Sequence, residues 1–424
     1  MSLLIKGGHV IDPSQGLDGV VDIRVEGEEI VEVGPDLQGG EIIDATGYYV
    51  SPGFVDVHVH FREPGQEYKE TIATGSRAAA RGGFTSVICM PNTEPAIDTK
   101  ALVDFVHGEG RRAGLCRVYC FGAITKARQG AELSPMAELA AAGAVGFSDD
   151  GDTIMNAEVC RRAYEYAGML GLPLSVHCED RHLVGSGVMN EGYMSTVLGL
   201  PGIPSASETI IVAREIELAR LTKTHVHINH LSTKESVELI RLAKRAGIPV
   251  SAEVTPHHLI LTDEDVAGYD TNTKMRPPLR TKADREALRA GLADGTIDCI
   301  ATDHAPHARE EKEVEYNYAA NGIIGLETAW PLVYTHLVLQ GVLTLSQAIG
   351  KLTWEPARLF KLPGGSLAPG GAADLTIWDP ETELEVTAEV FQGKSRNSPF
   401  MGKKLKGWPI LTLCGGKITW RDRV

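Results

Sequence analysis

The sequence lacks the features that mark several large classes of protein. Its 424 residues carry a net charge of -15, so there is no basic excess for binding nucleic acid or an anionic membrane. No stretch approaches the ~20 apolar residues of a membrane-spanning helix. The first residues also lack the basic start and apolar run of a signal peptide. We therefore expect a cytoplasmic protein that binds neither nucleic acid nor membranes.

Cysteine is too scarce for a disulfide-stabilised protein. The seven cysteines, an odd number, are scattered from Cys89 to Cys414, so no disulfide framework is expected. Cys116 and Cys120 lack a second cysteine pair at the spacing of a zinc site, and we interpret them as small buried apolar residues. Internal repeats and low-complexity segments are absent as well. What is present, 43% hydrophobic and 23% charged residues, is typical of an ordinary globular protein.

The middle of the chain alternates short β-branched runs with amphipathic helical stretches, which is the pattern of a parallel sheet. Helices are expected at residues 207–222 and 233–246, where apolar residues recur three and four positions apart. Eight βα units over roughly 300 residues fit a TIM-like (β/α)8 barrel, whose catalytic groups lie at the C-terminal ends of the strands. The expected strands are residues 55–60, 85–91, 117–124, 144–148, 173–177, 225–231, 249–256 and 298–303.

Both ends of the chain differ from the middle, because they contain short strands between turn signals and no strong helix. Neither end has enough apolar surface to be stable alone. We therefore expect residues 1–52 and 366–424 to pair into one small β-sandwich beside a catalytic barrel of residues 53–365. The expected strands of the sandwich are residues 3–5, 22–26, 29–33, 373–378, 384–387 and 412–420.

Two histidines, His58 and His60, stand one residue apart at the end of the first expected barrel strand. Alternate residues of a strand face the same way, so both rings can bind one metal ion. Taken alone, the pair could equally be two ordinary half-buried residues. The metal interpretation gains support because later strands also end in ligand-type residues. These are Asp149 and Asp150 after the fourth strand, His177 after the fifth, His230 after the sixth and Asp303 after the eighth.

This mixture of nitrogen and carboxylate donors suits zinc, with manganese, cobalt or iron as substitutes. It contains more ligands than one tetrahedral ion can bind. We therefore expect two Zn2+ ions that share a bridging carboxylate, which lower the pKa of a water and polarise a carbonyl. Asp303 is the candidate general acid/base, because a carboxylate beside the metals can take a proton and deliver it to a leaving nitrogen. The alternative is that Asp303 only caps the following helix.

The segments around these residues resemble dihydroorotases of the bacterial type I class, within the amidohydrolase superfamily. The resemblance is ordered and runs essentially from end to end. The histidine pair alone indicates only the superfamily. The segments Phe-Arg-Glu-Pro-Gly and Asp-Asp-Gly narrow the resemblance to dihydroorotases. The segments are His58-Val-His60-Phe-Arg62-Glu-Pro-Gly, Met90-Pro-Asn92-Thr, Phe147-Ser-Asp-Asp150-Gly, Val176-His177-Cys-Glu, Ile228-Asn-His230-Leu-Ser and Ala301-Thr-Asp303-His-Ala-Pro-His307.

The resemblance implies the reversible cyclisation of N-carbamoyl-L-aspartate to (S)-dihydroorotate in de novo pyrimidine (UMP) biosynthesis, with one or two zinc ions per subunit and two expected. It assigns the bridge to Asp150 rather than Asp149; relatives that hydrolyse hydantoins or allantoin have a carboxylated lysine there. The implied metal ligands are His58, His60, Asp150, His177, His230 and Asp303. The implied substrate contacts are His60, Arg62, Asn92, Arg276, His307, Asn321 and Gly322, the last two following a polar, lid-like loop of residues 307–320.

Two positions depart from the family pattern and affect the edge of the substrate pocket. Arg276 stands where the family usually has Asn, and Asn321 where Phe is common. Four other histidines are expected to have supporting or packing roles. They are His257 and His258, which follow the seventh strand, and His225 and His227, which lie deeper in the sixth.

Two alternatives remain beside a dihydroorotase. One is a hydantoinase-like or allantoinase-like cyclic amidohydrolase. The other is a non-catalytic structural partner of aspartate transcarbamoylase, a role that lost metal ligands would indicate, and here none is lost. Association with aspartate transcarbamoylase and homo-oligomer formation are possible for an active enzyme too. The sequence leaves open the metal, its occupancy and the oligomeric state.

Overall fold

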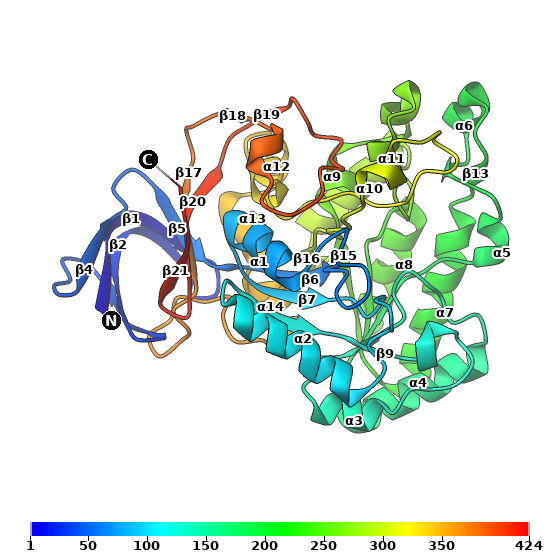
Figure 1. The fold of residues 1–424 in the computed structure, drawn as a ribbon, viewed down its shortest axis with the longest axis horizontal. Helices are drawn as coiled ribbons and strands as arrows, with labels where there is room; N and C mark the ends of the chain where they lie inside the picture. Colours follow the sequence, from blue (N-terminus) through cyan, green and yellow to red (C-terminus); the bar gives the residue numbers. More distant parts are fainter. Residues whose placement is uncertain (1, 423–424) are drawn as a thin grey trace.

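The computed structural model describes residues 2–422, which form two regions (Figure 1). One is a mixed sheet made from both ends of the chain, at the left of the view. The other consists of parallel strands with helices outside them, and it occupies the rest of the molecule. No helix among the described residues has the length and apolar character needed to cross a membrane.

The parallel strands form two sheets of three and six strands, in the orders β6-β7-β8 and β16-β15-β14-β11-β10-β9. Each expected barrel strand is present, but most are shorter than the apolar runs, because pairing with the neighbouring strands covers only part of each run. The expected strand at 117–124 is interrupted at Phe121, so it forms both β8 and β9. The bounds are β6 Phe54–Val59, β7 Phe84–Cys89, β8 Arg117–Cys120, β9 Gly122–Ala123, β10 Phe147–Ser148, β11 Leu174–Val176, β14 Val226–Ile228, β15 Val250–Val254 and β16 Cys299–Ile300.

The two parallel sheets approach each other at both edges. On one side, only Phe121 separates β8 from β9 along the chain. On the other side, the segment that follows β16 runs parallel to the end of β6, with a bridge between Val59 and His304. The His60 amide donates to the His304 carbonyl at 2.9 Å. The ends of β6 and β16 are therefore adjacent, which brings the residues after them together.

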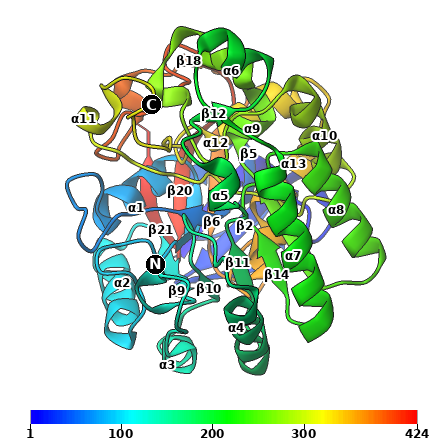
Figure 2. The same cartoon turned by 90° about the vertical axis from the view of Figure 1, so that its right-hand side faces the viewer.

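Helices surround these strands (Figure 2), and α7 and α8 pack on β14 and on β15. The longer helices are α1 Ile72–Arg81, α2 Lys100–Ala113, α3 Met136–Ala141, α4 Ala157–Leu170, α6 Tyr193–Leu198, α7 Ala206–Thr222, α8 Lys234–Arg245, α10 Lys282–Ala293, α13 Leu345–Leu352 and α14 Trp354–Leu359. The shorter helical turns are η1 Lys126–Arg128, α5 Arg181–Val184, α9 Pro256–Ile260, η2 Asp263–Gly268, η3 Thr271–Thr273, α11 Arg309–Lys312, α12 Ala329–Val333, η4 Tyr334–Val338 and η5 Ala388–Val390.

Helix α8 illustrates why these segments are helical and where they begin and end. The Thr233 hydroxyl accepts from the Ser236 amide, so it caps the first turn. Val237 and Ile240 recur at helical spacing and are buried. The expected bounds, 207–222 and 233–246, agree with α7 and α8 to within a residue at each end.

The two ends of the chain pair directly, as expected, because β17 lies antiparallel to β5 in one eight-stranded sheet. An apolar cluster that includes Ile5, Val50, Leu375 and Leu413 draws residues from both ends. The sheet has the order β21-β20-β17-β5-β1-β2-β3, with β4 pairing β1. Its strands are β1 Ser2–Asp12, β2 Leu17–Glu26, β3 Glu29–Gly34, β4 Glu41–Asp44, β5 Tyr49–Pro52, β17 Leu375–Asp379, β20 Trp408–Cys414 and β21 Lys417–Arg421.

Two expectations for the terminal strands were wrong in detail. The expected strand at 412–420 is a hairpin, since Gly415 and Gly416 both have positive φ and reverse the chain between β20 and β21. The apolar pattern continues through this turn, which is why the sequence predicts a single strand over residues 412–420. β4 and β5 were not expected at all, because their short runs are separated only by a turn.

Part of the C-terminal segment lies outside the terminal sheet. It contains the two-residue strands β18 (Leu384–Glu385) and β19 (Lys404–Leu405), which pair with each other. Its residues Phe391 and Phe400 belong to an apolar cluster that also contains Met275 and Ile323, from loops of the parallel-strand region. Another short pair, β12 (Met189–Asn190) and β13 (Gly202–Ile203), lies in the connection between α5 and α7.

Candidate metal centre and substrate pocket

His58 and His60 lie on the same side of the chain at the end of β6, with ring centroids 5.2 Å apart. His58 Nδ1 donates to Glu253 Oε1 at 2.6 Å, so the lone pair of the neutral His58 ring is on Nε2. That buried Nε2 atom has no hydrogen-bond partner among the described residues. His60 Nδ1 donates to Asn92 Oδ1 at 2.8 Å, which likewise leaves Nε2 as its lone-pair atom. Both rings are therefore oriented as metal ligands are.

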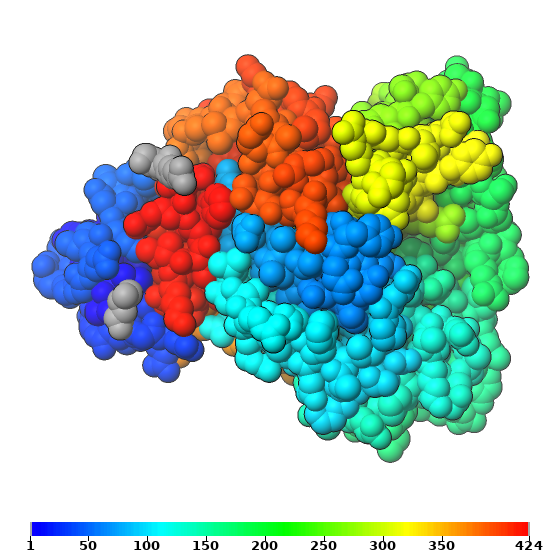
Figure 3. Space-filling view, viewed as in Figure 1, coloured from blue at the N-terminus to red at the C-terminus, as the bar shows by residue number. Residues whose placement is uncertain are grey.

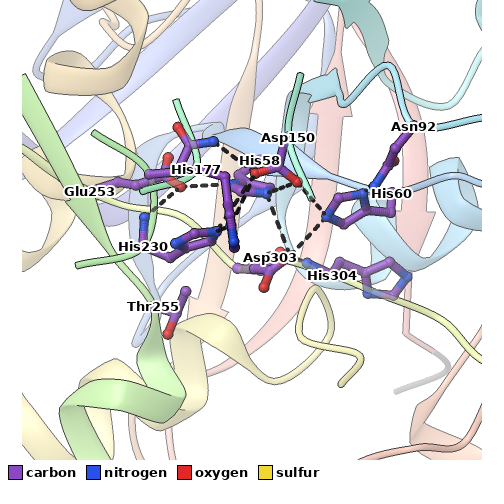
Figure 4. A network of polar contacts seen from close by, with 12 residues as sticks. His58, His60, Asn92, Asp150, His177, His230, Glu253, Thr255, Asp303 and His304 are labelled. Atoms are coloured by element: carbon purple, nitrogen blue, oxygen red, sulfur yellow. Dashed lines mark hydrogen bonds and ion pairs between the residues drawn. The ribbon is translucent and has the colours of Figure 1, made fainter. Parts of the chain in front are cut away.

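Asp150 lies between two pairs of histidines (Figure 4). Its Oδ2 atom is 3.5 Å from His58 Nε2 and 3.6 Å from His60 Nε2. Its Oδ1 atom is 3.6 Å from His230 Nε2 and 3.9 Å from His177 Nδ1. Two groups of potential ligands, each with its donor atoms within 4.8 Å of one another, thus share this one carboxylate. This is the arrangement expected of a bridging ligand.

Asp303 completes the cluster from the end of β16. Its Oδ1 atom is 2.9 Å from His60 Nε2 and 3.5 Å from His58 Nε2. A carboxylate facing the lone pair of His60 requires a proton or a metal ion between the two atoms. Asp303 and His230 both have positive φ, 49° and 28°, a strained backbone that non-glycine residues rarely adopt and that often occurs at functional sites.

The charges of the cluster suit a divalent cation. Burial alone raises the pKa of a carboxyl, yet the histidines hold the pKa of Asp150 and Asp303 below the ordinary value. Burial alone lowers the pKa of a histidine, yet Asp150, Glu253 and Asp303 raise the pKa of His58 well above its usual range. The carboxylates thus favour positive charge beside them, and metal ions can supply that charge. The donor set and the unpartnered Nε2 of His58 fit such ions.

Carboxylate and amide groups inside the sheet support the cluster, and the sequence reasoning missed them. Glu253 on β15 is fully buried, contacts His58, and is 3.1 Å from His227 Nε2. Opposing the effect of burial, these histidines lower the pKa of Glu253 to about 2. Asn229 donates to Asp150 Oδ1 at 2.9 Å. The available signal was an acidic residue within an apolar strand, which is rarely buried without a partner.

Asp149, the other candidate for the bridge, points away from the cluster. Its Oδ1 atom accepts from the amides of Ile124 and Thr125 at 2.8 and 3.1 Å, and its Oδ2 atom from the Thr125 hydroxyl. Three of the four remaining histidines have side-chain partners in the fold, whereas the buried Nε2 of His257 has no hydrogen-bond partner among the described residues. His225 and His227 both contact Ser251 Oγ at 2.8 Å, and His258 contacts the Pro277 carbonyl at 3.0 Å.

A cavity of about 210 Å³ opens beside the cluster. Every predicted site residue except His58, which lies behind it, contributes to its wall. The predicted residues in the wall are His60, Arg62, Asn92, Asp150, His177, His230, Arg276, Asp303, His307, Asn321 and Gly322. The structure thus brings together residues from almost the whole length of the parallel-strand region.

Arg62 provides a buried positive charge in this wall. Its Nε atom donates to the Pro306 carbonyl at 3.2 Å, and its Nη2 atom is 3.4 Å from His307 Nε2. Burial lowers the pKa of Arg62 to about 10, so it remains a cation at neutral pH. In residues 2–422 it has no ion-pair partner. A buried unpaired guanidinium favours binding of an anion in the cavity.

Arg276 also lines the cavity and is less buried than Arg62. Its Nη1 atom is 3.5 Å from Glu179 Oε2, which is also 3.6 Å from His177 Nε2. Gly322 has a φ of 134°, and a Cβ there would lie 2.7 Å from the Ala305 Cβ. Only glycine fits this position of the wall.

Comparison with known proteins identifies the family. A family model described as dihydro-orotase-like matches residues 47–236. A dihydroorotase of Pelotomaculum thermopropionicum is 54% identical over 426 residues, covering 100% of both chains. A dihydroorotase of Pelobacter propionicus is 52% identical, covering 99% of this chain and 100% of that protein. The chain belongs to the dihydroorotase family. Among solved structures, the L-hydantoinase (dihydropyrimidinase) of Arthrobacter aurescens matches with a TM-score of 0.88 and 26% identity, over 100% of this chain and 96% of that one.

Proposed function

We propose that this dihydroorotase-family protein is a cyclic amide hydrolase that interconverts N-carbamoyl-L-aspartate and (S)-dihydroorotate in pyrimidine biosynthesis. The observation that carries this proposal is the buried, unpaired guanidinium of Arg62 in a cavity beside a histidine and carboxylate cluster. Dihydroorotate has a carboxylate on its ring, whereas a simple hydantoin or dihydropyrimidine has hydrogen there. The relatives that match over the full length of the chain are named dihydroorotases. This favours dihydroorotase activity over a hydantoinase-like activity.

The cluster would hold two divalent ions, which we propose to be zinc. His58, His60 and Asp303 would bind one ion, His177 and His230 the other, and Asp150 both. When bound, such ions supply an activated water and polarise a carbonyl. The donor types suit zinc and also manganese, cobalt or iron.

The protein's own groups then orient the substrate and move the proton. Arg62 binds the ring carboxylate, with Asn92 and His307 beside it, and Asn321, Gly322 and Arg276 contact the rest of the ring. During hydrolysis, Asp303 accepts a proton from the attacking water and delivers it to the ring nitrogen as the amide bond breaks. In cyclisation Asp303 moves the proton in the reverse direction, from the nitrogen to the departing water oxygen. Glu253 keeps the His58 ring in its orientation throughout.

The finer assignments of fold and class are also proposals. We propose that β6 to β11 and β14 to β16 form one closed (β/α)8 barrel, since their two sheets adjoin at Phe121 and at the bridge between Val59 and His304. We propose that residues 53–365 are the catalytic domain and that 1–52 and 366–424 form a β-sandwich. An aspartate at 150 and the Arg-Glu-Pro-Gly segment support the bacterial type I class.

Cytoplasmic location, homo-oligomer formation and association with aspartate transcarbamoylase stay predictions. The last can be tested by sedimentation of a mixture of the two proteins at micromolar concentration. A complex would support the association, and unaltered sedimentation of both proteins would contradict it.

The function is tested by assaying the metal-reconstituted protein with dihydroorotate and with dihydrouracil, which lacks the carboxylate. We expect dihydroorotate to be hydrolysed far more efficiently, because a site built for a charged group rejects an analogue without it. Arg62→Met should lower kcat/KM for dihydroorotate by ~10²-fold, the cost of losing a charge-assisted pair, and change dihydrouracil hydrolysis little. Equal efficiency on both substrates in the unmodified protein would instead favour a hydantoinase-like enzyme.

A further inference from the structure

Lys312 is a buried residue of the loop of residues 307–320, beside the cavity. It is the last residue of α11 and is 4% exposed. Its Nζ atom donates to the carbonyl oxygens of Ala320 at 2.8 Å, Gly322 at 3.1 Å and Lys274 at 3.3 Å. The three N–H groups of an ammonium thus have three backbone acceptors. No carboxylate forms an ion pair with Lys312 in the part of the chain that the structure describes.

These acceptors belong to two segments of the chain, and each segment carries residues that line the cavity. Lys274 precedes Arg276 by two residues, and Ala320 and Gly322 flank Asn321. The Gly322 amide donates to the Lys274 carbonyl at 2.9 Å, so the two segments also contact each other directly. Lys312 therefore sits where both segments meet, beside the cavity. The surrounding segment forms part of the molecular surface, yellow in Figure 3, between green and orange regions.

We propose that Lys312 is a positioning residue for substrate binding, whose ammonium group clamps the Lys274, Ala320 and Gly322 carbonyls and so holds both segments against the substrate. The inference rests on the proposed dihydroorotase function, because it concerns the loop side of the same cavity. Lys312 does not line that cavity and acts only through the backbone it binds.

The charge of Lys312 is costly to bury, which argues for a role beyond packing. Burial and the nearby Lys274 lower the pKa of Lys312 to about 7, and Asp270 and Glu311 oppose this only in part. Glu311 is itself paired with Lys69 at 2.8 Å. Lys274 is a second buried cation, and it donates to the Asn317 carbonyl at 2.9 Å in the same loop.

The lowered pKa sets the direction of a pH effect. Below pH 7 the group is an ammonium with three donors, and above pH 7 it becomes an amine with two donors and a lone pair. One of the three carbonyls then loses its donor. The clamp is therefore complete at acidic pH and weakens as the pH rises through about 7.

The experiment compares Lys312→Met with the unmodified metal-loaded enzyme, measuring kcat and KM for dihydroorotate from pH 6 to pH 9. At pH 6 we expect KM to rise about 10-fold with kcat nearly unchanged, since displaced binding groups weaken substrate positioning. At pH 9 the difference between the two KM values should be smaller, because the unmodified enzyme has then lost one of its three donors but keeps the other two. Ionisation of the substrate affects both proteins equally and cancels in the ratio.

Lys351→Met is the matched control. Lys351 is a half-buried lysine whose Nζ atom donates to the Ile297 carbonyl at 2.7 Å, and burial lowers its pKa too. It lies near the start of β16, whereas Asp303 follows the end of that strand. We expect its KM to equal that of the unmodified enzyme at every pH, even where its melting temperature falls.

An unchanged KM in Lys312→Met at pH 6, or a KM ratio that is the same at pH 6 and pH 9, would overturn the proposal. If Lys312→Met does not fold, Lys312→Gln replaces it, and this variant, with two N–H donors, should match the unmodified enzyme at pH 9 but not at pH 6. An unmodified enzyme that fails to turn over dihydroorotate would refute the proposed function instead, which is a different outcome.

Discussion

The two walls of the cavity are built in different ways. On the strand wall, Asp150 and His230 are at most 3% exposed and are held by side chains inside the sheet. On the loop wall, the Arg276 side chain is 36% exposed, and the segments around it are held through backbone carbonyls. The strand wall is thus fixed by the packing of the whole fold, whereas the loop wall depends on a few local contacts.

This difference assigns different tasks to the two walls. Preorganised ligands on rigid strands suit chemistry, because metals and proton donors must hold their geometry. Loop segments can change between relatives without disturbing the strands, so they suit the choice of substrate. Substitutions on the strand wall should therefore reduce metal content or kcat, and substitutions on the loop wall should mainly change KM.

The largest effect is expected for Asp150→Ala, because Asp150 belongs to both groups of potential ligands. We expect loss of metal from both sites and no measurable turnover, checked by metal analysis and the dihydroorotate assay. Asp150 needs no carbon dioxide to become a carboxylate, unlike a carboxylated lysine. Metal-free unmodified protein should therefore regain full activity without bicarbonate. Intact turnover in the metal-replete variant, or strong bicarbonate dependence, would contradict this assignment.

Asp303→Asn should separate proton transfer from metal binding on the same wall. We expect turnover to fall by ~10²–10⁴-fold, as is typical when a general acid/base is lost, while the protein still folds. The measurement is kcat at saturating dihydroorotate, with circular dichroism and metal content as controls. Near-normal kcat would rule out Asp303 as the proton carrier and leave it as a ligand or a helix cap.

The strand wall was predictable from sequence because its signals are local and repeated. Alternation along a strand puts His58 and His60 on one side, and βα topology brings the strand ends to one edge. Its support was less predictable. Glu253 contacts His58 across 195 positions of sequence, a pairing fixed by the order of strands in the sheet.

The loop wall and the chain ends show where sequence reasoning fails. Lys312 has no motif of its own, since its acceptors are backbone carbonyls that any residue supplies. Strand ends were placed too far along because pairing depends on the neighbouring strand, not on the apolar run alone. The hairpin at Gly415 and Gly416 did have a local signal, a Gly-Gly pair within an apolar pattern, and it was overlooked.

Glu253→Gln tests whether the strand wall depends on groups behind the ligands. We expect metal affinity to fall by ~10–100-fold, because the amide binds His58 Nδ1–H less strongly than a carboxylate. Competition with a chelator measures this without reference to activity. Glu215→Gln is the matched control, since Glu215 is 1% exposed but contacts Arg214 and Tyr164 on the helical side. Equal metal affinity in both variants would show that Glu253 is not needed for binding.

The smallest effect is expected on the loop wall, for Arg276→Asn, which introduces the residue that the family resemblance predicts at this position. The contact of Arg276 with Glu179 is 3.5 Å long and partly exposed, and ion pairs of this kind contribute about 1 kcal/mol or less. Because Arg276 is proposed to contact the ring and not its carboxylate, KM should change by no more than ~5-fold, with kcat and metal content unaltered. A much larger rise in KM for dihydroorotate, but not for dihydrouracil, would show that Arg276 shares the ring carboxylate with Arg62. A loss of metal would show that Arg276 acts through Glu179 on His177, and the separation between the two walls would then fail at this residue.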